Sequence, residues 1–116
     1  MDKQKILIVD DSEMNRDLLV EILKNQYDIV EANNGAEAIT ILSQQRKDFS
    51  LLLLDIFMPE MDGLTLVKEV NEINPELKII VLTGFDNFEY AQKCCKMNVN
   101  DFLLKPVDEE ELTSVI

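Results

Sequence analysis

The sequence predicts an α/β sandwich in which five parallel strands alternate with five helices. Short apolar runs of the length typical of buried strands alternate with segments whose apolar residues recur at helical spacing. Because a helix-sized segment joins each strand to the next, the connections are expected to be right-handed crossovers and the sheet parallel. A chain of 116 residues is long enough for one hydrophobic core, so we expect a single domain over residues 1–116.

The expected strands are short runs rich in Leu, Ile or Val, bounded by charged or turn-forming residues. They cover residues 6–9, 27–32, 51–54, 79–82 and 102–104. The four leucines of residues 51–54 have no polar interruption, which indicates a strand buried on both faces. Residues 27–32 alternate less clearly and end at an Asn-Asn-Gly turn, so we assign them to an outer strand.

The expected helices cover residues 14–25, 36–45, 64–73, 84–98 and 108–116. The first is predicted by apolar residues at helical spacing, namely Met14, Leu18, Leu19, Ile22 and Leu23. Either Asp11 or Ser12 is available to cap its start. The last helix reaches Ile116 with its apolar face unfinished, so we expect the parent protein to continue beyond this residue.

The charge balance excludes several function classes. With 11 basic and 23 acidic residues the net charge is −12, which disfavours direct binding to nucleic acid or to an anionic membrane. No apolar run approaches the roughly 20 residues of a membrane span, and the first residues turn acidic too soon for a signal peptide. We therefore expect a cytoplasmic domain.

The adjacent Cys94 and Cys95 are expected to be reduced packing residues, because the chain has no His and no second cysteine cluster.

Polar side chains follow four of the expected strands. They are Asp10 and Asp11 after the first, Asp55 after the third, Thr83 after the fourth and Lys105 after the fifth. Reactive groups gather at the carboxyl ends of strands in open parallel sheets, so we expect these residues to meet. Converging carboxylates repel one another unless one is protonated or a cation binds, and oxygen ligands favour Mg²⁺ or Mn²⁺ over Zn²⁺. Such a site suits phosphoryl transfer, with Asp55 as the nucleophile.

Each of these residues also has an ordinary structural explanation. Acids after strands cap helices, a Thr after a strand is often a turn residue, and a Lys before Pro is usually solvated. Taken singly, the ordinary explanation is the more frequent one. The coincidence of four strand ends favours a functional site.

Four motifs resemble one protein family. IVDD at residues 8–11, LLDIFMPEMDG at 53–63, VLTG at 81–84 and FLLKP at 102–106 are similar to the receiver domains of two-component response regulators. The resemblance covers essentially the whole chain. It implies a flavodoxin-like fold with strand order 2-1-3-4-5, and a signalling domain that catalyses only its own phosphorylation and dephosphorylation.

The resemblance also implies a chemical role for each site residue. Asp55 is the expected phosphoacceptor, and Lys105 pairs with the phosphoryl group. Asp11 is expected to bind Mg²⁺ directly and Asp10 to bind it through water. The backbone carbonyl of Phe57 completes the expected protein ligands.

Receivers signal through a conformational switch, and the resemblance assigns it to Thr83 and Phe102. The Thr83 hydroxyl moves to the phosphoryl group and Phe102 turns into the space that it leaves, which alters the face formed by the fourth helix, fifth strand and fifth helix. Two further aromatic residues, Phe57 and Phe85, lie two positions past Asp55 and Thr83. We expect them to shield the phosphoryl group from water.

The expected partners also follow from the resemblance. The donor is a phosphohistidine on a sensor histidine kinase or a histidine phosphotransfer protein, since this chain contains no His. An output domain is expected to lie C-terminal in the parent chain, and a phosphorylation-dependent dimer is compatible with this arrangement. FDNFEYA resembles receivers with AraC-type output, whereas VDDSEMNRDLL also occurs with sensor kinases or cyclic-nucleotide enzymes, so the output stays open.

Three other functions are less consistent with the sequence. A phosphatase of the haloacid dehalogenase type needs an acid two residues after its nucleophile, where this chain has Phe57 or Ser12. A nucleotide or flavin module needs a glycine- or hydroxyl-rich phosphate loop after the first strand, where this chain is acidic. A receiver fold without the chemistry is disfavoured because no site residue is missing.

Overall fold

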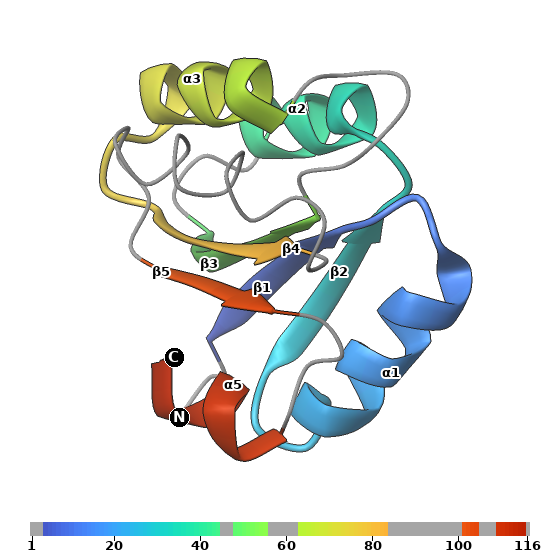
Figure 1. Ribbon diagram of the computed structural model, residues 1–116. Coiled ribbons are helices and arrows are strands. Elements are labelled where there is room, and N and C mark those ends of the chain that lie inside the picture. The colour runs from blue at the N-terminus through green and yellow to red at the C-terminus, as the bar shows by residue number, and fades with distance from the viewer. Residues whose placement is uncertain (1–3, 45–47, 56–62, 84–100, 105–108, 116) are drawn as a thin grey trace.

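The computed structural model describes residues 4–44, 48–55, 63–83, 101–104 and 109–115. In these residues strands and helices alternate along the chain. The elements are β1 (Lys5–Val9), α1 (Glu13–Leu23), β2 (Asp28–Ala32), α2 (Gly35–Gln44), β3 (Phe49–Asp55), α3 (Gly63–Ile73), β4 (Lys78–Thr83), β5 (Asp101–Leu104) and α5 (Glu109–Val115). Figure 1 shows α2 and α3 on one face of the sheet and α1 and α5 on the other, so the predicted α/β sandwich has three layers.

The five strands form one parallel sheet in the order β2-β1-β3-β4-β5, as predicted. The strand predicted to be the outer one, β2, lies at an edge. The two strands that carry the acidic residues, β1 and β3, are neighbours, with Val9 paired to Leu54. The helices that follow them, α1 and α3, cover opposite faces of the sheet (Figure 1). This change of face between adjacent strands is where α/β sheets place their binding sites.

The leucine run of β3 supplies both halves of the core. Leu52 and Leu54 pack on one face with a cluster that includes Leu42 of α2 and Val67 of α3. Leu51 and Leu53 pack on the other face with a cluster that includes Leu19 and Leu23 of α1 and Leu112 of α5. Successive side chains of a strand point to opposite faces, so an uninterrupted apolar run has this outcome. The prediction of a strand buried on both faces is confirmed.

Element boundaries differ from the expectations by one or two residues at most ends. Helix α1 ends at Leu23 rather than Asn25, and β3 begins at Phe49 and includes Asp55. The Lys24 N–H donates to the Val20 carbonyl at 2.8 Å and closes the last turn of α1. The predicted fourth helix, residues 84–98, lies outside the described residues.

Helix α1 is confirmed, but only part of its apolar pattern is buried. Leu19 and Leu23 face the core, whereas Met14 is 74% exposed and Leu18 is 60% exposed. Arg16 takes the inward position one turn before Leu19 and is 8% exposed. Positions 16, 19 and 23 lie on one helical face, so turning that face toward the sheet leaves Met14 and Leu18 in solvent.

Candidate metal centre

Three predicted site residues meet at the carboxyl edge of the sheet. Asp10, Asp11 and Asp55 each offer a carboxylate oxygen, and these oxygens all lie within 4.8 Å of one another. Asp10 is 1% exposed and Asp55 is 6% exposed, whereas Asp11 is exposed to solvent. The cluster therefore has two buried acids and one acid that faces outward. We refer to these three residues as the carboxylate cluster.

Strand pairing explains why Asp10 and Asp55, 45 positions apart, come together. Asp55 is the last residue of β3, and Asp10 directly follows β1. Since Val9 pairs with Leu54 in a parallel ladder, the next residue of each strand emerges at the same level. The Asp10 N–H donates to the Ala32 carbonyl at 3.2 Å, which extends the contact with β2 by one residue.

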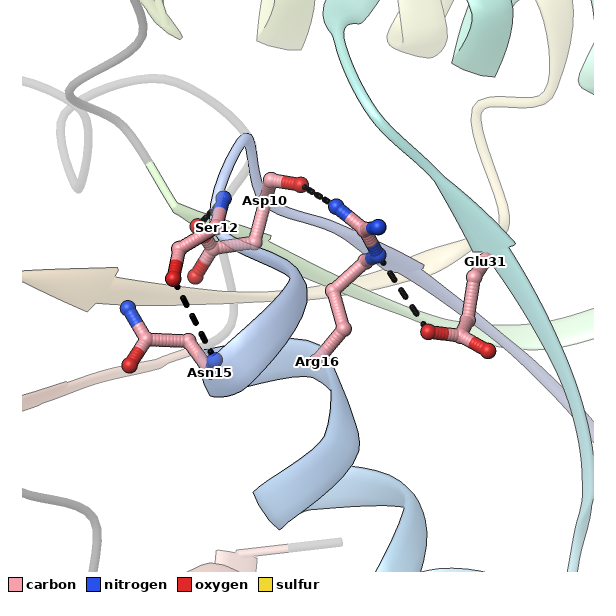
Figure 2. A network of polar contacts seen from close by, with 5 residues as sticks. All are labelled: Asp10, Ser12, Asn15, Arg16 and Glu31. Atoms are coloured by element: carbon pink, nitrogen blue, oxygen red, sulfur yellow. Dashed lines mark hydrogen bonds and ion pairs between the residues drawn. The ribbon is translucent and has the colours of Figure 1, made fainter.

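The turn between β1 and α1 orients the Asp10 carboxylate. The Ser12 N–H donates to Asp10 Oδ1 at 2.9 Å, and Ser12 Oγ accepts from the Asn15 N–H at 3.3 Å (Figure 2). Ser12, rather than Asp11, is therefore the N-cap of α1. One residue thus caps the helix with its side chain and orients a buried acid with its backbone, which leaves Asp11 free of capping.

Arg16 and Glu31 also belong to this region, although the sequence reasoning gave neither a role. Arg16 Nη1 donates to the Asp10 carbonyl oxygen at 2.5 Å, and Arg16 Nε donates to Glu31 Oε1 at 3.2 Å. Figure 2 shows the guanidinium between the Asp10 turn and the edge strand β2. The sequence signal that could have found Arg16 is its spacing, because Arg16 shares a helical face with Leu19 and Leu23.

The chemistry of the cluster fits a hard divalent cation. Two unit charges 4.8 Å apart repel by about 1 kcal/mol in water and by about 3 kcal/mol at the effective dielectric of a protein surface. A cation among the three acids would convert this repulsion into attraction. Carboxylate oxygens, with Asp11 open to solvent for water ligands, suit Mg²⁺ or Mn²⁺ rather than Zn²⁺. The role of these acids as metal ligands stays a prediction.

The other predicted site residues are described only in part. Thr83 is the last residue of β4, one position past Leu82, which pairs with Asp55, so its backbone lies at the same edge of the sheet. The backbone of Phe102 pairs with Val81 in β5. The side chains of Thr83 and Phe102 lie outside the described part of the chain, as do all atoms of Phe57, Phe85 and Lys105.

Among the residues that the structure describes, none of the helices combines the length and the apolar character needed to cross a bilayer.

Comparison with known proteins identifies a family. A family model described as "Response regulator receiver domain" matches residues 6–116. The response regulator receiver protein CpdR of Brucella abortus is 46% identical over 83 residues, which cover 72% of this chain and 68% of CpdR. The uncharacterized transcriptional regulatory protein YesN of Bacillus subtilis is 36% identical over 95% of this chain, but this chain spans only 30% of YesN.

Solved structures agree with this assignment. The REC domain of AraT, a response regulator from Geobacillus stearothermophilus, has a TM-score of 0.86 and is 39% identical, over 97% of this chain and 88% of that one. A response regulator receiver domain protein from Clostridium thermocellum has a TM-score of 0.91 at 24% identity, over 97% and 90% of the two chains. At that identity the second structure supports the fold alone, which is flavodoxin-like.

Proposed function

This chain belongs to the response regulator receiver domain family of two-component signalling, and we propose that its Asp55 accepts a phosphoryl group from the phosphohistidine of a partner protein. The observation that carries this proposal is the carboxylate cluster. It places Asp55 beside two further acids at the edge of the sheet where the family's fold binds ligands.

We propose that Asp10, Asp11, Asp55 and the Phe57 carbonyl hold a Mg²⁺ or Mn²⁺ ion. When bound, the ion would neutralise charge on the cluster and on the incoming phosphoryl oxygens. The protein groups do the positioning. Ser12 fixes the carboxylate of Asp10, and the ladder between β1 and β3 fixes the level of Asp55 beside it.

The transfer itself is a nucleophilic substitution at phosphorus. A carboxylate oxygen of Asp55 attacks the phosphorus of the phosphohistidine, and an O–P bond forms as the P–N bond breaks. The electron pair of the P–N bond stays on the imidazole nitrogen, which takes up a proton. Lys105 and Thr83 would contact the phosphoryl oxygens, since an ammonium and a hydroxyl both donate hydrogen bonds to them.

The same domain is proposed to act as a switch. Thr83 ends β4 next to β5, whose Phe102 pairs with Val81 along the backbone. Movement of the Thr83 hydroxyl toward the phosphoryl group would open space for Phe102 and change the surface of β5 and α5. We propose that an output domain, C-terminal in the parent chain, or a second copy of this domain reads that surface.

The proposed partner of this domain, which we place in the cytoplasm, is a sensor histidine kinase or a histidine phosphotransfer protein. Two exposed apolar residues one turn apart on α1, Met14 and Leu18, support a docking surface near the cluster. We call this pair the α1 patch. Helix α1 begins at the turn that carries Asp10 and Asp11, so a partner that delivers a phosphoryl group to Asp55 would lie within reach of this patch.

The decisive experiment is phosphorylation by a small donor followed by intact-mass measurement. With Mg²⁺ and acetyl phosphate, the protein should gain one phosphate-sized adduct, and EDTA should prevent it. Asp55→Ala should abolish the adduct, because it removes the attacking oxygen. Asp17→Asn is the matched control, since Asp17 is an exposed acid on α1 outside the cluster. An adduct that persists in Asp55→Ala would assign the acceptor to another residue.

A further inference from the structure

Arg16 is a long cationic side chain in a place normally taken by an apolar one. It lies on the inward face of α1, in line with the buried Leu19 and Leu23, and is 8% exposed. Burying a guanidinium costs free energy unless its N–H groups find acceptors. A role in packing alone would be served better by Leu or Met at this position. The hydrogen bonds of Arg16 therefore indicate what it does.

The guanidinium of Arg16 joins the β1–α1 turn to the side chain of Glu31 on β2. Its Nη1 donates to the Asp10 carbonyl oxygen at 2.5 Å, and its Nε donates to Glu31 Oε1 at 3.2 Å. Glu31 is on β2, where it pairs with Ile8 of β1. Figure 2 shows Arg16 extending from α1 to both partners. The planar fork of the guanidinium makes these two bonds in a fixed geometry.

The carbonyl that Arg16 holds belongs to the peptide bond between Asp10 and Asp11. Peptide bonds are planar, so fixing this oxygen fixes the plane from which the Asp11 Cα departs. Asp10 is held at three points, by the Ala32 carbonyl, by the Ser12 N–H and by Arg16. Asp11 is exposed. Its direction therefore depends strongly on the peptide plane that Arg16 holds.

We propose that Arg16 is a positioning residue for the two acids after β1, which it aligns as cation ligands by holding the peptide plane between them. Glu31 orients the guanidinium of Arg16 for this role. By accepting from Nε it keeps the guanidinium turned toward the backbone and β2, so that the positive charge is compensated and the carboxylates stay available to a cation. This inference rests on the proposed function, because it concerns the Mg²⁺ site of that function.

Positioning and simple charge predict opposite results, which makes the inference testable. If Arg16 acted only as a nearby positive charge, Arg16→Gln would tighten Mg²⁺ binding by removing repulsion. If Arg16 positions the ligands, the same substitution weakens Mg²⁺ binding, by about tenfold if it follows other outer-sphere partners of metal ligands. Arg16→Lys keeps the charge but loses the fork, so positioning predicts weaker binding and charge alone predicts no change.

The measurement is the dissociation constant for Mg²⁺ by isothermal titration calorimetry, on wild type, Arg16→Gln and Arg16→Lys. Thermal unfolding in EDTA identifies which variants are folded at the temperature of the titration. If Arg16→Gln is unfolded there, Arg16→Lys decides by itself. The initial rate of phosphorylation by acetyl phosphate should need more Mg²⁺ for half-saturation in both variants, and should approach the wild-type maximum at saturating Mg²⁺.

Lys24→Gln is the matched control. Lys24 is the C-cap residue of the same helix, and its side chain makes an ion pair with Glu21 at 3.0 Å, but both side chains are exposed. This control should leave the Mg²⁺ affinity unchanged. The double variant Arg16→Gln/Glu31→Gln adds a second test, because charge effects would cancel and return wild-type affinity, whereas loss of positioning would remain.

The outcomes separate the two proposals. A wild-type protein that neither binds Mg²⁺ nor takes up phosphate contradicts the proposed function. If the wild type does both, the variants test the positioning role. Equal or tighter Mg²⁺ binding in a folded Arg16→Gln contradicts that role, as does unchanged binding in a folded Arg16→Lys. Either result leaves the proposed function intact.

Discussion

Helices α1 and α2 begin alike and are built differently. Each follows a parallel strand and starts at a side-chain cap, with Ser12 Oγ accepting from Asn15 and Asn34 Oδ1 accepting from Glu37. Their lengths are 11 and 10 residues. Helix α2 then follows the usual rule and buries small and apolar side chains, whereas α1 buries an arginine and exposes a methionine and a leucine.

The contrast shows that α1 is adapted to the site as well as to the core. The buried residues of α2 are Gly35, Ala38 and Leu42, and the last two belong to the core cluster that α2 shares with the sheet and α3. The inward face of α1 gives one position to Arg16, whose bonds go to the turn that carries two acids of the carboxylate cluster. At that position α1 buries a side chain that binds the backbone beside the cluster, instead of an apolar side chain.

The largest expected difference between the helices concerns leucine truncation. Leu42→Ala should lower the free energy of unfolding by about 2 to 5 kcal/mol, because Leu42 is fully buried and leaves a cavity. Leu18→Ala should change it by less than about 0.5 kcal/mol, because Leu18 is an exposed surface residue. Urea denaturation in EDTA measures both. Equal losses would mean that Leu18 is buried in solution.

The two caps allow a more balanced comparison. Ser12→Ala and Asn34→Ala should each cost about 1 kcal/mol in the free energy of unfolding, the usual value of a side-chain N-cap. Only Ser12→Ala should also weaken Mg²⁺ binding. Loss of this cap loosens the start of α1, which positions both the Ser12 amide that holds Asp10 and the side chain of Arg16. Denaturation and calorimetric titration on the two variants test this. A loss of Mg²⁺ affinity in Asn34→Ala as well would show that the effect is a general loss of stability.

The smallest expected effect concerns the α1 patch. Leu18→Gln should slow phosphoryl transfer from a phosphorylated histidine kinase by about threefold, as for a contact outside the energetic centre of an interface. Its rate with acetyl phosphate should not change, because that donor needs no docking surface. Thr40→Gln, an exposed change on α2, is the control. The test uses a panel of purified, radiolabelled kinases, and a kinase that transfers equally to both variants would place the docking surface elsewhere.

Much of the fold and part of the candidate site follow from local sequence patterns. The four leucines of β3 predicted a strand buried on both faces, and the two core clusters confirm it. Asp10 follows β1 and Asp55 ends β3. The carboxyl ends of parallel strands lie at one edge of a sheet, so the approach of these two acids was predictable. The side chains of Thr83 and Phe102, and residues such as Lys105, lie outside the described part of the chain, and their roles remain predictions.

Local pattern determined the alternation of strands and helices, the central place of β3 and the acidic character of the edge where Asp10, Asp11 and Asp55 meet, because hydrophobic period and chain direction are properties of short segments. The tertiary structure alone decided that Arg16 faces inward while Met14 and Leu18 face solvent. The acceptors that make a buried guanidinium tolerable, the Asp10 carbonyl and Glu31, come within its reach only after β1 and β2 have paired. The sequence of α1 by itself does not show which acceptors Arg16 meets.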